Sequence, residues 1–476
     1  MQSPKLRSTS HFDENLQPFN NFGVNKTRFL LGKQVKSSII SSFNLSKGLY
    51  TMGTLISILG IVVLLAIAFL LSNNRKAINL RTIFGALGIQ IAIGALILYV
   101  PVGRDALLWL SDGISKVIAY GNEGIGFLFG GLVSDKMFEV FGGGGFVFAL
   151  RVLPIIVFFS ALISVLYYIG IMQWIIKIIG GGLQTLLGTS RSESMSAAAN
   201  IFVGQTEAPL VVKPYISKMT ESELFAIMCG GLASIAGSVM AGYAGMGVPL
   251  PYLIAASFMA APAGLLFAKI LYPQTEKFND DLEKVDLEKP ANILDAAAGG
   301  ASAGMNLALN VGAMLIAFVA LIALINGILG GIGGWFNMPE LSLGLILGWI
   351  FKPLAWVIGV DWNQAEIAGR MIGTKLAVNE FVGYLDFTAY LKAAAADTNM
   401  IQLTDKTQAI ITFALCGFAN FSSIAILIGG LGALAPNRRG DIARLGIKAV
   451  IAGSLANLMS ATIAGLFIGL GGVALS

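Results

Sequence analysis

A short cluster of polar side chains interrupts a chain that is otherwise strongly apolar. Gln205, Thr206 and Glu207 stand directly before the apolar segment that contains Pro209. Their amide, hydroxyl and carboxylate groups can together donate and accept several hydrogen bonds. A carboxylate at membrane depth costs about 3 kcal/mol or more unless it is paired or faces a wet cavity. We therefore interpret this cluster as half of a solute-binding site in a secondary transporter.

The sequence around this cluster predicts two helical arms that are too short to cross a bilayer. Residues 192–203 would form about 18 Å of helix and residues 208–216 about 14 Å, whereas the hydrocarbon core is about 30 Å thick. Gly204 is placed to end the first arm, and Thr206 to cap the second, whose first turn tolerates Pro209. We therefore expect a re-entrant hairpin whose tip is enclosed by protein or faces a cavity.

A second acid stands in a similar setting later in the chain. Within residues 340–385, an apolar stretch ends near Val360, a polar turn follows at 361–364, and a second helix runs into Asn379 and Glu380. This order predicts a second re-entrant hairpin, which again delivers an acid beside an amide.

Each predicted hairpin is followed by an apolar run with a polar interruption. Residues 233–238 interrupt the first run, and residues 416–423 interrupt the second. Interrupted segments at corresponding positions of two halves indicate a binding site near the middle of the membrane, between inverted repeats. The two halves share this plan but no strong residue-level repeat.

The composition defines the class of protein and excludes several kinds of chemistry. The chain has 476 residues, of which 56% are hydrophobic and 12% charged, and its mean hydropathy is +0.78. Such values are typical of polytopic helical membrane proteins. The only histidine, His11, lies within the basic residues 1–51, which alone account for the formal net charge of +5. We therefore expect no histidine-dependent catalysis, no histidine-ligated zinc and no nucleic-acid binding. Cys229 and Cys416 lie in separate apolar runs and predict buried, unpaired thiols.

Hydropathy predicts an all-α membrane protein with eight transmembrane helices, two re-entrant helical hairpins and interfacial helices. An amphipathic interfacial helix is expected within residues 104–140, and a solvated or interfacial helix at 274–290. The predicted spans are 53–72, 82–101, 146–170, 223–246, 250–272, 306–330, 407–434 and 444–472.

The charge distribution predicts the orientation of this arrangement. The basic residues of the loops fall on one side of an eight-span threading, which should be cytoplasmic and would leave both termini periplasmic. Residues 1–51 show no signal-peptide pattern, and we interpret them as a disordered or non-native leader.

Three motifs occur in order along the chain: GQTEAP at 204–209, NEFVGY at 379–384 and GFANFSS at 417–423. They resemble the signature motifs of the concentrative nucleoside transporters in their bacterial, eight-span form, over about residues 52–476. The resemblance implies a homotrimer in the bacterial inner membrane that imports nucleosides with sodium by an elevator-like motion. Its partners would be nucleosides, the lipid bilayer and further copies of the chain, and not nucleic acid.

The resemblance also implies roles for individual residues. Three residues of the first hairpin would contact the nucleobase: Gln205, Thr206 and Glu207. Three later polar residues would hold the ribose, with one aromatic ring packing against the nucleoside: Glu380, Asn420 and Ser423, with Phe418. Sodium would be bound chiefly by backbone oxygens, together with the Ser234 hydroxyl, at four positions: Asn200, Val203, Ser234 and Ile235. Because ion and nucleoside share one hairpin, sodium should raise nucleoside affinity.

The same resemblance implies a division into a scaffold and a mobile transport domain. The leader is 1–51 and the C-terminal span is 436–476. The expected scaffold segments are 52–180 and 247–335, and the expected transport segments are 181–246 and 336–435.

Several alternatives remain open at this point. Protons could replace sodium as the coupling ion, with Glu207 or Glu380 as the titrating group. Either acid could instead form a structural ion pair, and Arg370 or Lys375 could partner Glu380 or Glu366. The Ser234 hydroxyl could bond back to its own helix. A channel would place polar groups along one open path, and an enzyme would need a nucleophile with a base, so we expect neither.

Overall fold

The computed structural model describes residues 53–141, 145–278 and 290–471, and these form helices and no strands. The predicted leader at 1–51 lies outside the described residues. Most of the helix expected at 274–290 also lies outside them, and its described beginning, residues 274–278, is not helical. The all-α class predicted from the sequence is confirmed.

Seven of the described helices are long and apolar enough to cross a membrane. Each corresponds to one predicted span, and the predicted span at 407–434 is the one without such a helix. The seven are Gly53–Leu70, Leu80–Leu98 (α2), Phe148–Tyr168 (α5 and α6), Glu221–Gly245 (α10 and α11), Leu250–Leu271 (α12), Ile293–Trp335 (α13) and Pro436–Gly469, which contains α19 (Arg439–Gly469). The number of spans in the membrane stays a prediction.

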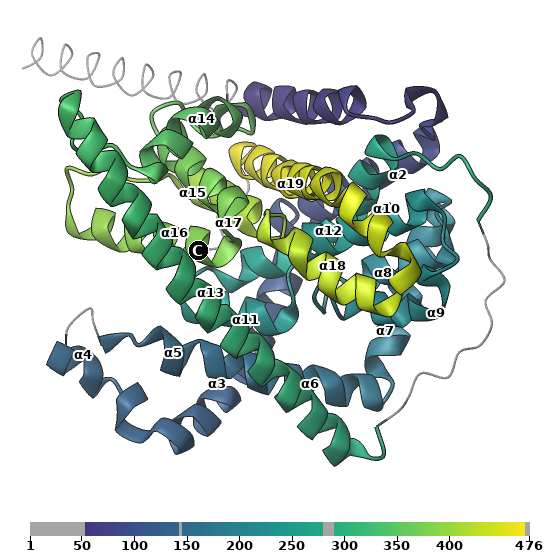
Figure 1. Ribbon diagram of the computed structural model, residues 1–476, viewed down its shortest axis with the longest axis horizontal. Coiled ribbons are helices and arrows are strands. Elements are labelled where there is room, and N and C mark those ends of the chain that lie inside the picture. Colours follow the sequence, from purple (N-terminus) through teal and green to yellow (C-terminus); the bar gives the residue numbers. More distant parts are fainter. Residues whose placement is uncertain (1–52, 142–144, 279–289, 472–476) are drawn as a thin grey trace, which may run out of the picture. The chain divides into compact units, whose positions relative to one another are not determined.

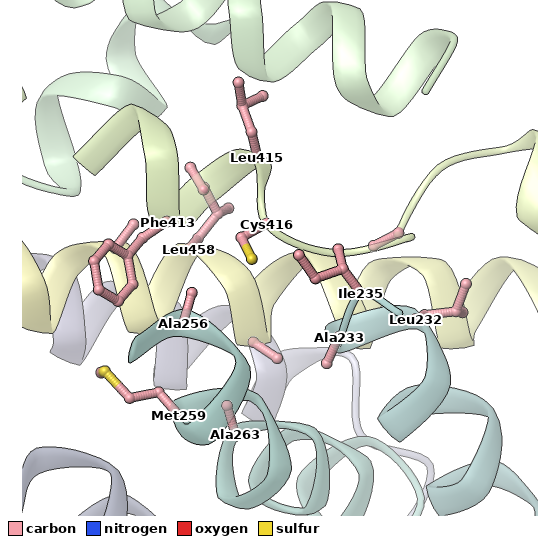
Figure 2. Packing of buried hydrophobic residues seen from close by; sticks show 14 of the residues in the cluster. Leu232, Ala233, Ile235, Ala256, Met259, Ala263, Phe413, Leu415, Cys416 and Leu458 are labelled. Atoms are coloured by element: carbon pink, nitrogen blue, oxygen red, sulfur yellow. The ribbon is translucent and has the colours of Figure 1, made fainter. Parts of the chain in front are cut away.

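Both predicted interruptions are present. The helix after the first hairpin is divided into α10 (Glu221–Ala233) and α11 (Gly237–Gly245). The predicted span at 407–434 is divided into α17 (Asp405–Leu415) and α18 (Ser422–Leu434), which explains why neither piece is long enough to span alone. The two interruptions lie beside each other and against α19, as Figure 2 shows at Ala233, Ile235 and Cys416.

The first hairpin is shorter in helix than the sequence predicts. Its first arm is α8 (Arg191–Ala199), and its second consists of a 3-10 turn, η4 (Ala208–Val212), and α9 (Lys213–Ile216). The prediction that Gly204 ends the first arm is wrong: the α-helix ends at Ala199, and the tighter, three-residue bonds from Ile201 to the Ala198 carbonyl and from Phe202 to the Ala199 carbonyl replace the α-helical pattern there.

The capping of the second arm also differs from the prediction, whereas its proline is placed as expected. Glu207 precedes the 3-10 turn, which has no side-chain cap, so the cap predicted for Thr206 is wrong. Pro209 does fall in the first turn, where its missing N–H is not needed.

The second hairpin is built from α15 (Ala365–Ala377) and α16 (Glu380–Ala396). Its tip is Val378 and Asn379, and the Asn379 side chain caps α16 by accepting from the Val382 N–H at 3.0 Å. The apolar stretch that we expected to be its first arm is α14 (Leu343–Val357), which precedes the hairpin and packs along α15.

Two further helices frame these hairpins. The helix expected within 104–140 is α3 (Pro101–Phe129), followed by η2 (Gly130–Val133) and α4 (Lys136–Phe141). α13 is 43 residues long and crosses α6 at its glycines Gly300 and Gly304 (Figure 1). It begins before the predicted span 306–330 because Asn292 caps it at the N–H groups of Leu294 and Asp295.

Most side chains of α13 are exposed, whereas α10, α12 and α19 form the buried centre with α17. α7 (Ile171–Leu187) leads into the first hairpin. Cys229 and Cys416 are both buried and free, as predicted.

Candidate functional site

One pocket brings the two hairpins and both interruptions together. Its lining includes all seven residues that the sequence analysis assigned to a solute: Gln205, Thr206, Glu207, Glu380, Phe418, Asn420 and Ser423. Val239 of α11 and three apolar residues of α13, Leu307, Val311 and Met314, complete an apolar wall. The pocket therefore combines hydrogen-bonding groups with apolar surface, as small-molecule sites do.

Glu380 is the most firmly held acid in this pocket. It is the first residue of α16, where the helix dipole favours a negative charge, and it is only 3% exposed. The Tyr243 hydroxyl donates to its Oε1 at 3.0 Å, and the Asn420 amide donates to its Oε2 at 3.0 Å. Both carboxylate oxygens thus have a neutral donor, and each keeps a further lone pair that can accept from a solute hydroxyl.

Tyr243 was missed by the sequence analysis. It lies on α11, fully buried between the rings of Phe381 and Tyr384, with centroid separations of 4.7 and 4.6 Å. A buried tyrosine hydroxyl needs a hydrogen-bond partner, and that need was the one available signal. The sequence could not show which partner it takes, because Glu380 is 137 residues away.

Asn420 organises the second interruption. Its Oδ1 accepts from the Ser423 N–H at 2.9 Å and from the Ser422 hydroxyl at 2.7 Å, while its amide nitrogen donates to Glu380. The Ser423 hydroxyl in turn accepts from Gln205 Nε2 at 3.4 Å. This chain of contacts links the tip of the first hairpin to the acid of the second.

The tip of the first hairpin is less completely satisfied. Thr206 is half-buried, and Glu207 is exposed. Gln205 is buried, yet its Oε1 has no hydrogen-bond partner within the described part of the chain. Phe418 is half-buried beside this tip, and its N–H donates to the Ser234 carbonyl at 3.1 Å. The free acceptors at this tip can therefore receive donors from a bound solute.

The four positions assigned to sodium are all buried around the end of α8 and the first interruption. Asn200 is 1% exposed, and neither its Oδ1 nor its Nδ2 has a partner among the described residues. Val203, Ser234 and Ile235 are similarly enclosed. A buried amide without partners is costly, so this site suits an additional ligand for its oxygen.

The chemistry of this donor set favours a hard cation with oxygen ligands. Ser234 does donate its hydroxyl to the Gly230 carbonyl at 3.0 Å, which is the helix-bonded alternative, and its oxygen still has lone pairs for a cation. The described residues contain no group of three or more His, Cys, Asp or Glu side chains that could hold a metal. Neutral oxygen donors suit a hard, monovalent ion better than a transition metal.

The basic residues near the second hairpin have partners other than Glu380. Arg370 forms a two-point pair with Asp386, with both N–O distances 2.9 Å. Lys352 pairs with Glu366 at 3.1 Å. Lys375 donates to the Ala414 carbonyl and to Asn457 Oδ1, at 2.8 and 2.6 Å. Glu380 is therefore held by hydrogen bonds and not by a direct ion pair.

Short, interrupted helices that carry polar groups into one buried pocket define an all-α membrane transporter. Family models match most of the chain. They are described as Na+ dependent nucleoside transporter N-terminus (residues 59–132), nucleoside recognition (149–250) and Na+ dependent nucleoside transporter C-terminus (252–465).

Curated relatives and solved structures agree with these matches. An uncharacterized transporter of Haemophilus influenzae is 72% identical over 89% of this chain and 100% of its own length. The nucleoside permease NupC of Helicobacter pylori is 60% identical over 88% of this chain and 98% of its own. CNTnw in an inward-facing substrate-bound state is 68% identical, covering 88% of this chain and 99% of its own, with a TM-score of 0.85. An outward-facing variant of CNTnw, also 68% identical, covers 89% of this chain and 100% of its own with a TM-score of 0.86.

The chain belongs to the concentrative nucleoside transporter family. It is a secondary transporter of nucleosides and not an enzyme, because its relatives are permeases and transporters. The resemblance predicted from the three motifs is thereby confirmed.

Proposed function

We propose that this protein imports nucleosides together with sodium, and that the pocket between the two hairpins holds the nucleoside. The observation that carries the proposal is the Glu380 carboxylate, buried and oriented by Tyr243 and Asn420 while open to the pocket. A ribose presents adjacent hydroxyl donors, and a carboxylate with free lone pairs is their natural acceptor. Asn420 and Ser423 supply further polar groups at the same wall.

The nucleobase is proposed to lie toward the first hairpin. Gln205, Thr206 and Glu207 together offer donors and acceptors, and the unpartnered Gln205 Oε1 can accept from a base N–H. Phe418 and the apolar residues of α13 offer surfaces against which a planar base can pack. A solute without these hydroxyl and N–H groups would leave buried polar atoms unpaired, and such sites therefore discriminate strongly.

Sodium is the coupling ion that the site supports best. The unpartnered Asn200 side chain, Val203, Ser234 and Ile235 bring oxygen donors together next to the hairpin tip. The family description as Na+ dependent supports the same ion. The competing candidate is a proton carried by Glu207 or Glu380. It is less favoured because Glu380 already serves as an oriented acceptor, and because proton coupling gives no role to the unpartnered Asn200.

An elevator-like motion is proposed for the transport step, in a homotrimer of the bacterial inner membrane with periplasmic termini. Support comes from the hydrogen bonds that join the two halves, Gln205 to Ser423 and Phe418 to Ser234, so that both hairpins can move as one body.

The transport domain is proposed to contain the segments 181–246 and 336–435, with 52–180 in the scaffold. α12 lies in the segment 247–335 that we expected to be scaffold, but its Lys269 forms a buried ion pair with Glu193 of the first hairpin. We therefore assign α12 to the transport domain.

Uptake into proteoliposomes tests this function. Purified protein should accumulate labelled uridine or adenosine under an inward sodium gradient and lose this activity in Glu380→Gln. Uptake driven only by a proton gradient would overturn the sodium site at Asn200 and Ser234 while keeping the nucleoside. A lack of sodium- or proton-driven accumulation, in liposomes shown to be sealed, would contradict the proposed symport.

A further inference from the structure

The two helix interruptions lie beside each other (Figure 2) and are joined by buried hydrogen bonds. α10 ends at Ala233 and α17 ends at Leu415, and the last carbonyl groups of any helix lack partners within that helix. Phe418 N–H of the second interruption donates to the Ser234 carbonyl of the first at 3.1 Å. Buried carbonyl groups that lack a partner within their own helix require donors from other segments.

Asn457 of α19 supplies these donors to both interruptions. Its Nδ2 donates to the Ala233 carbonyl at 2.6 Å and to the Cys416 carbonyl at 2.8 Å. Its Oδ1 accepts from Lys375 Nζ at 2.6 Å. The residue is 3% exposed, and a Cβ on the neighbouring Gly417 would collide with its amide group. Asn457 is thus fixed in one orientation by its three partners.

Lys375 connects this arrangement to the second hairpin. It lies on α15, is 2% exposed, and donates to the Ala414 carbonyl as well as to Asn457. A cation at the carboxyl end of a helix is stabilised by the helix dipole, here that of α17. Its ammonium therefore holds the hairpin, α17 and α19 together.

We propose that Asn457 and Lys375 form a coupling clasp that transmits cation binding at the first interruption to the nucleoside pocket at the second. The clasp is defined as these two side chains with their three carbonyl partners, those of Ala233, Ala414 and Cys416. Both are positioning residues, since neither lines the pocket. The inference rests on the proposed function and explains how its two sites act on each other.

The position of the clasp along the chain supports this role. Ser234 and Ile235, proposed for sodium, directly follow Ala233, whose carbonyl the Asn457 amide binds. Phe418 and Asn420, proposed for the nucleoside, follow Cys416, whose carbonyl the same amide binds. A cation that orders the first peptide segment therefore orders the second through one shared donor group. By linkage, the nucleoside must raise sodium affinity by the same factor.

The test measures uridine dissociation constants of the full-length protein in nanodiscs, once in saturating sodium chloride and once in choline chloride. The ratio of the two constants is the coupling factor. Asn457→Asp retains an acceptor for Lys375 but loses the amide that donates to both carbonyls, so the coupling factor should fall by about fivefold or more. Lys375→Met, which breaks the clasp from the hairpin side, should lower it in the same direction.

Ser460→Ala is the matched control. Ser460 lies on the same helix, is equally buried and accepts from Gln90 of α2 at 2.9 Å, without touching either interruption. It should keep the wild-type coupling factor. Melting temperatures of all variants identify any that fail to fold. If Asn457→Asp does not fold, the proposal is tested with Lys375→Met alone.

Uridine binding that weakens equally in both cations would show a merely structural role and overturn the clasp. An equal fall of the coupling factor in Ser460→Ala would do the same. Wild-type protein that binds uridine with one affinity in both cations would overturn both the clasp and the sodium site, while keeping nucleoside binding. Wild-type protein that binds no nucleoside in either salt would instead refute the proposed nucleoside pocket itself.

Discussion

The two hairpin tips deliver the same kinds of group but hold them differently. At the second tip, Glu380 is 3% exposed and accepts one hydrogen bond at each carboxylate oxygen. At the first tip, Glu207 is exposed, and the Gln205 Oε1 and the Asn200 amide lack partners among the described residues. We therefore expect the second half of the proposed site to be organised before a solute arrives, and the first half to be completed by its ligands. Preorganised groups cost less to use on binding, so we expect the second tip to contribute most of the affinity.

The largest effect should follow from Glu380→Gln. The substitution replaces one acceptor oxygen by an amide donor, which then faces the Tyr243 hydroxyl or the Asn420 amide. We expect uridine affinity to fall about 100-fold, or about 3 kcal/mol, as measured by binding in nanodiscs. Glu366→Gln is the control, because Glu366 pairs with Lys352 away from the pocket. A larger loss in Glu207→Gln would reverse the comparison between the tips.

The next effect tests the incomplete first half. Asn200→Ala should raise the sodium concentration needed for half-maximal uridine uptake by about tenfold, since it removes a proposed oxygen ligand. The melting temperature in choline should change little, because the asparagine amide makes no hydrogen bond within the described residues. Uridine uptake at a series of sodium concentrations measures the first quantity, and thermal melting in choline and in sodium measures the second. Equal destabilisation in the two salts would show that Asn200 is a structural residue.

Tyr243→Phe should have an intermediate effect. It removes one hydrogen bond to the Glu380 carboxylate, worth about 1.5 kcal/mol, so uridine affinity should fall about tenfold. The loss should be smaller for a nucleoside without ribose 2′- and 3′-hydroxyl groups. Tyr384→Phe is the matched control, because that hydroxyl donates to the Thr412 carbonyl instead. If Tyr243→Phe lowered the affinity for both nucleosides by the same factor, Tyr243 would not act by orienting Glu380 toward the ribose hydroxyl groups.

The smallest effect on uridine should come from Glu207→Gln. The side chain is exposed at the first tip, where water competes for its hydrogen bonds, so the affinity should fall by about threefold. Its signature should be a changed ratio of purine to pyrimidine affinity, measured by competition with adenosine and cytidine. A uniform change across all nucleosides would place Glu207 outside the base-contacting set.

Local pattern was sufficient to predict the polar features of this fold. Both interruptions, the acid and amide at each tip and the position of Pro209 follow from short polar stretches inside apolar runs. The length of the first arm of the first hairpin could not be predicted from these stretches. Gly204 and Thr206 are ordinary capping residues, but three-residue bonds to the Ala198 and Ala199 carbonyls tighten the chain before either is reached. Capping propensity is weak compared with the packing that encloses this tip.

The partners of the buried polar groups could not be predicted for a different reason. Tyr243 and Glu380 are 137 residues apart, and Asn457 is 224 residues from Ala233, whose carbonyl it binds. A single sequence shows that such groups need partners, but it does not show which ones. The sequence left the partner of Lys375 open between two acids, whereas the structure gives it two neutral oxygens.

α13 lines the pocket and is also long enough to cross the surrounding bilayer. Its 43 residues form a helix about 65 Å long, roughly twice the thickness of the hydrocarbon core. A helix of this length must tilt or extend beyond the lipid tails, and membrane thickness is one of the factors that act on such a helix. Leu307, Val311 and Met314 on the same helix form the apolar wall of the pocket. We therefore expect the acyl-chain length of the host membrane to affect the position of α13 and, through it, the shape of the proposed solute site.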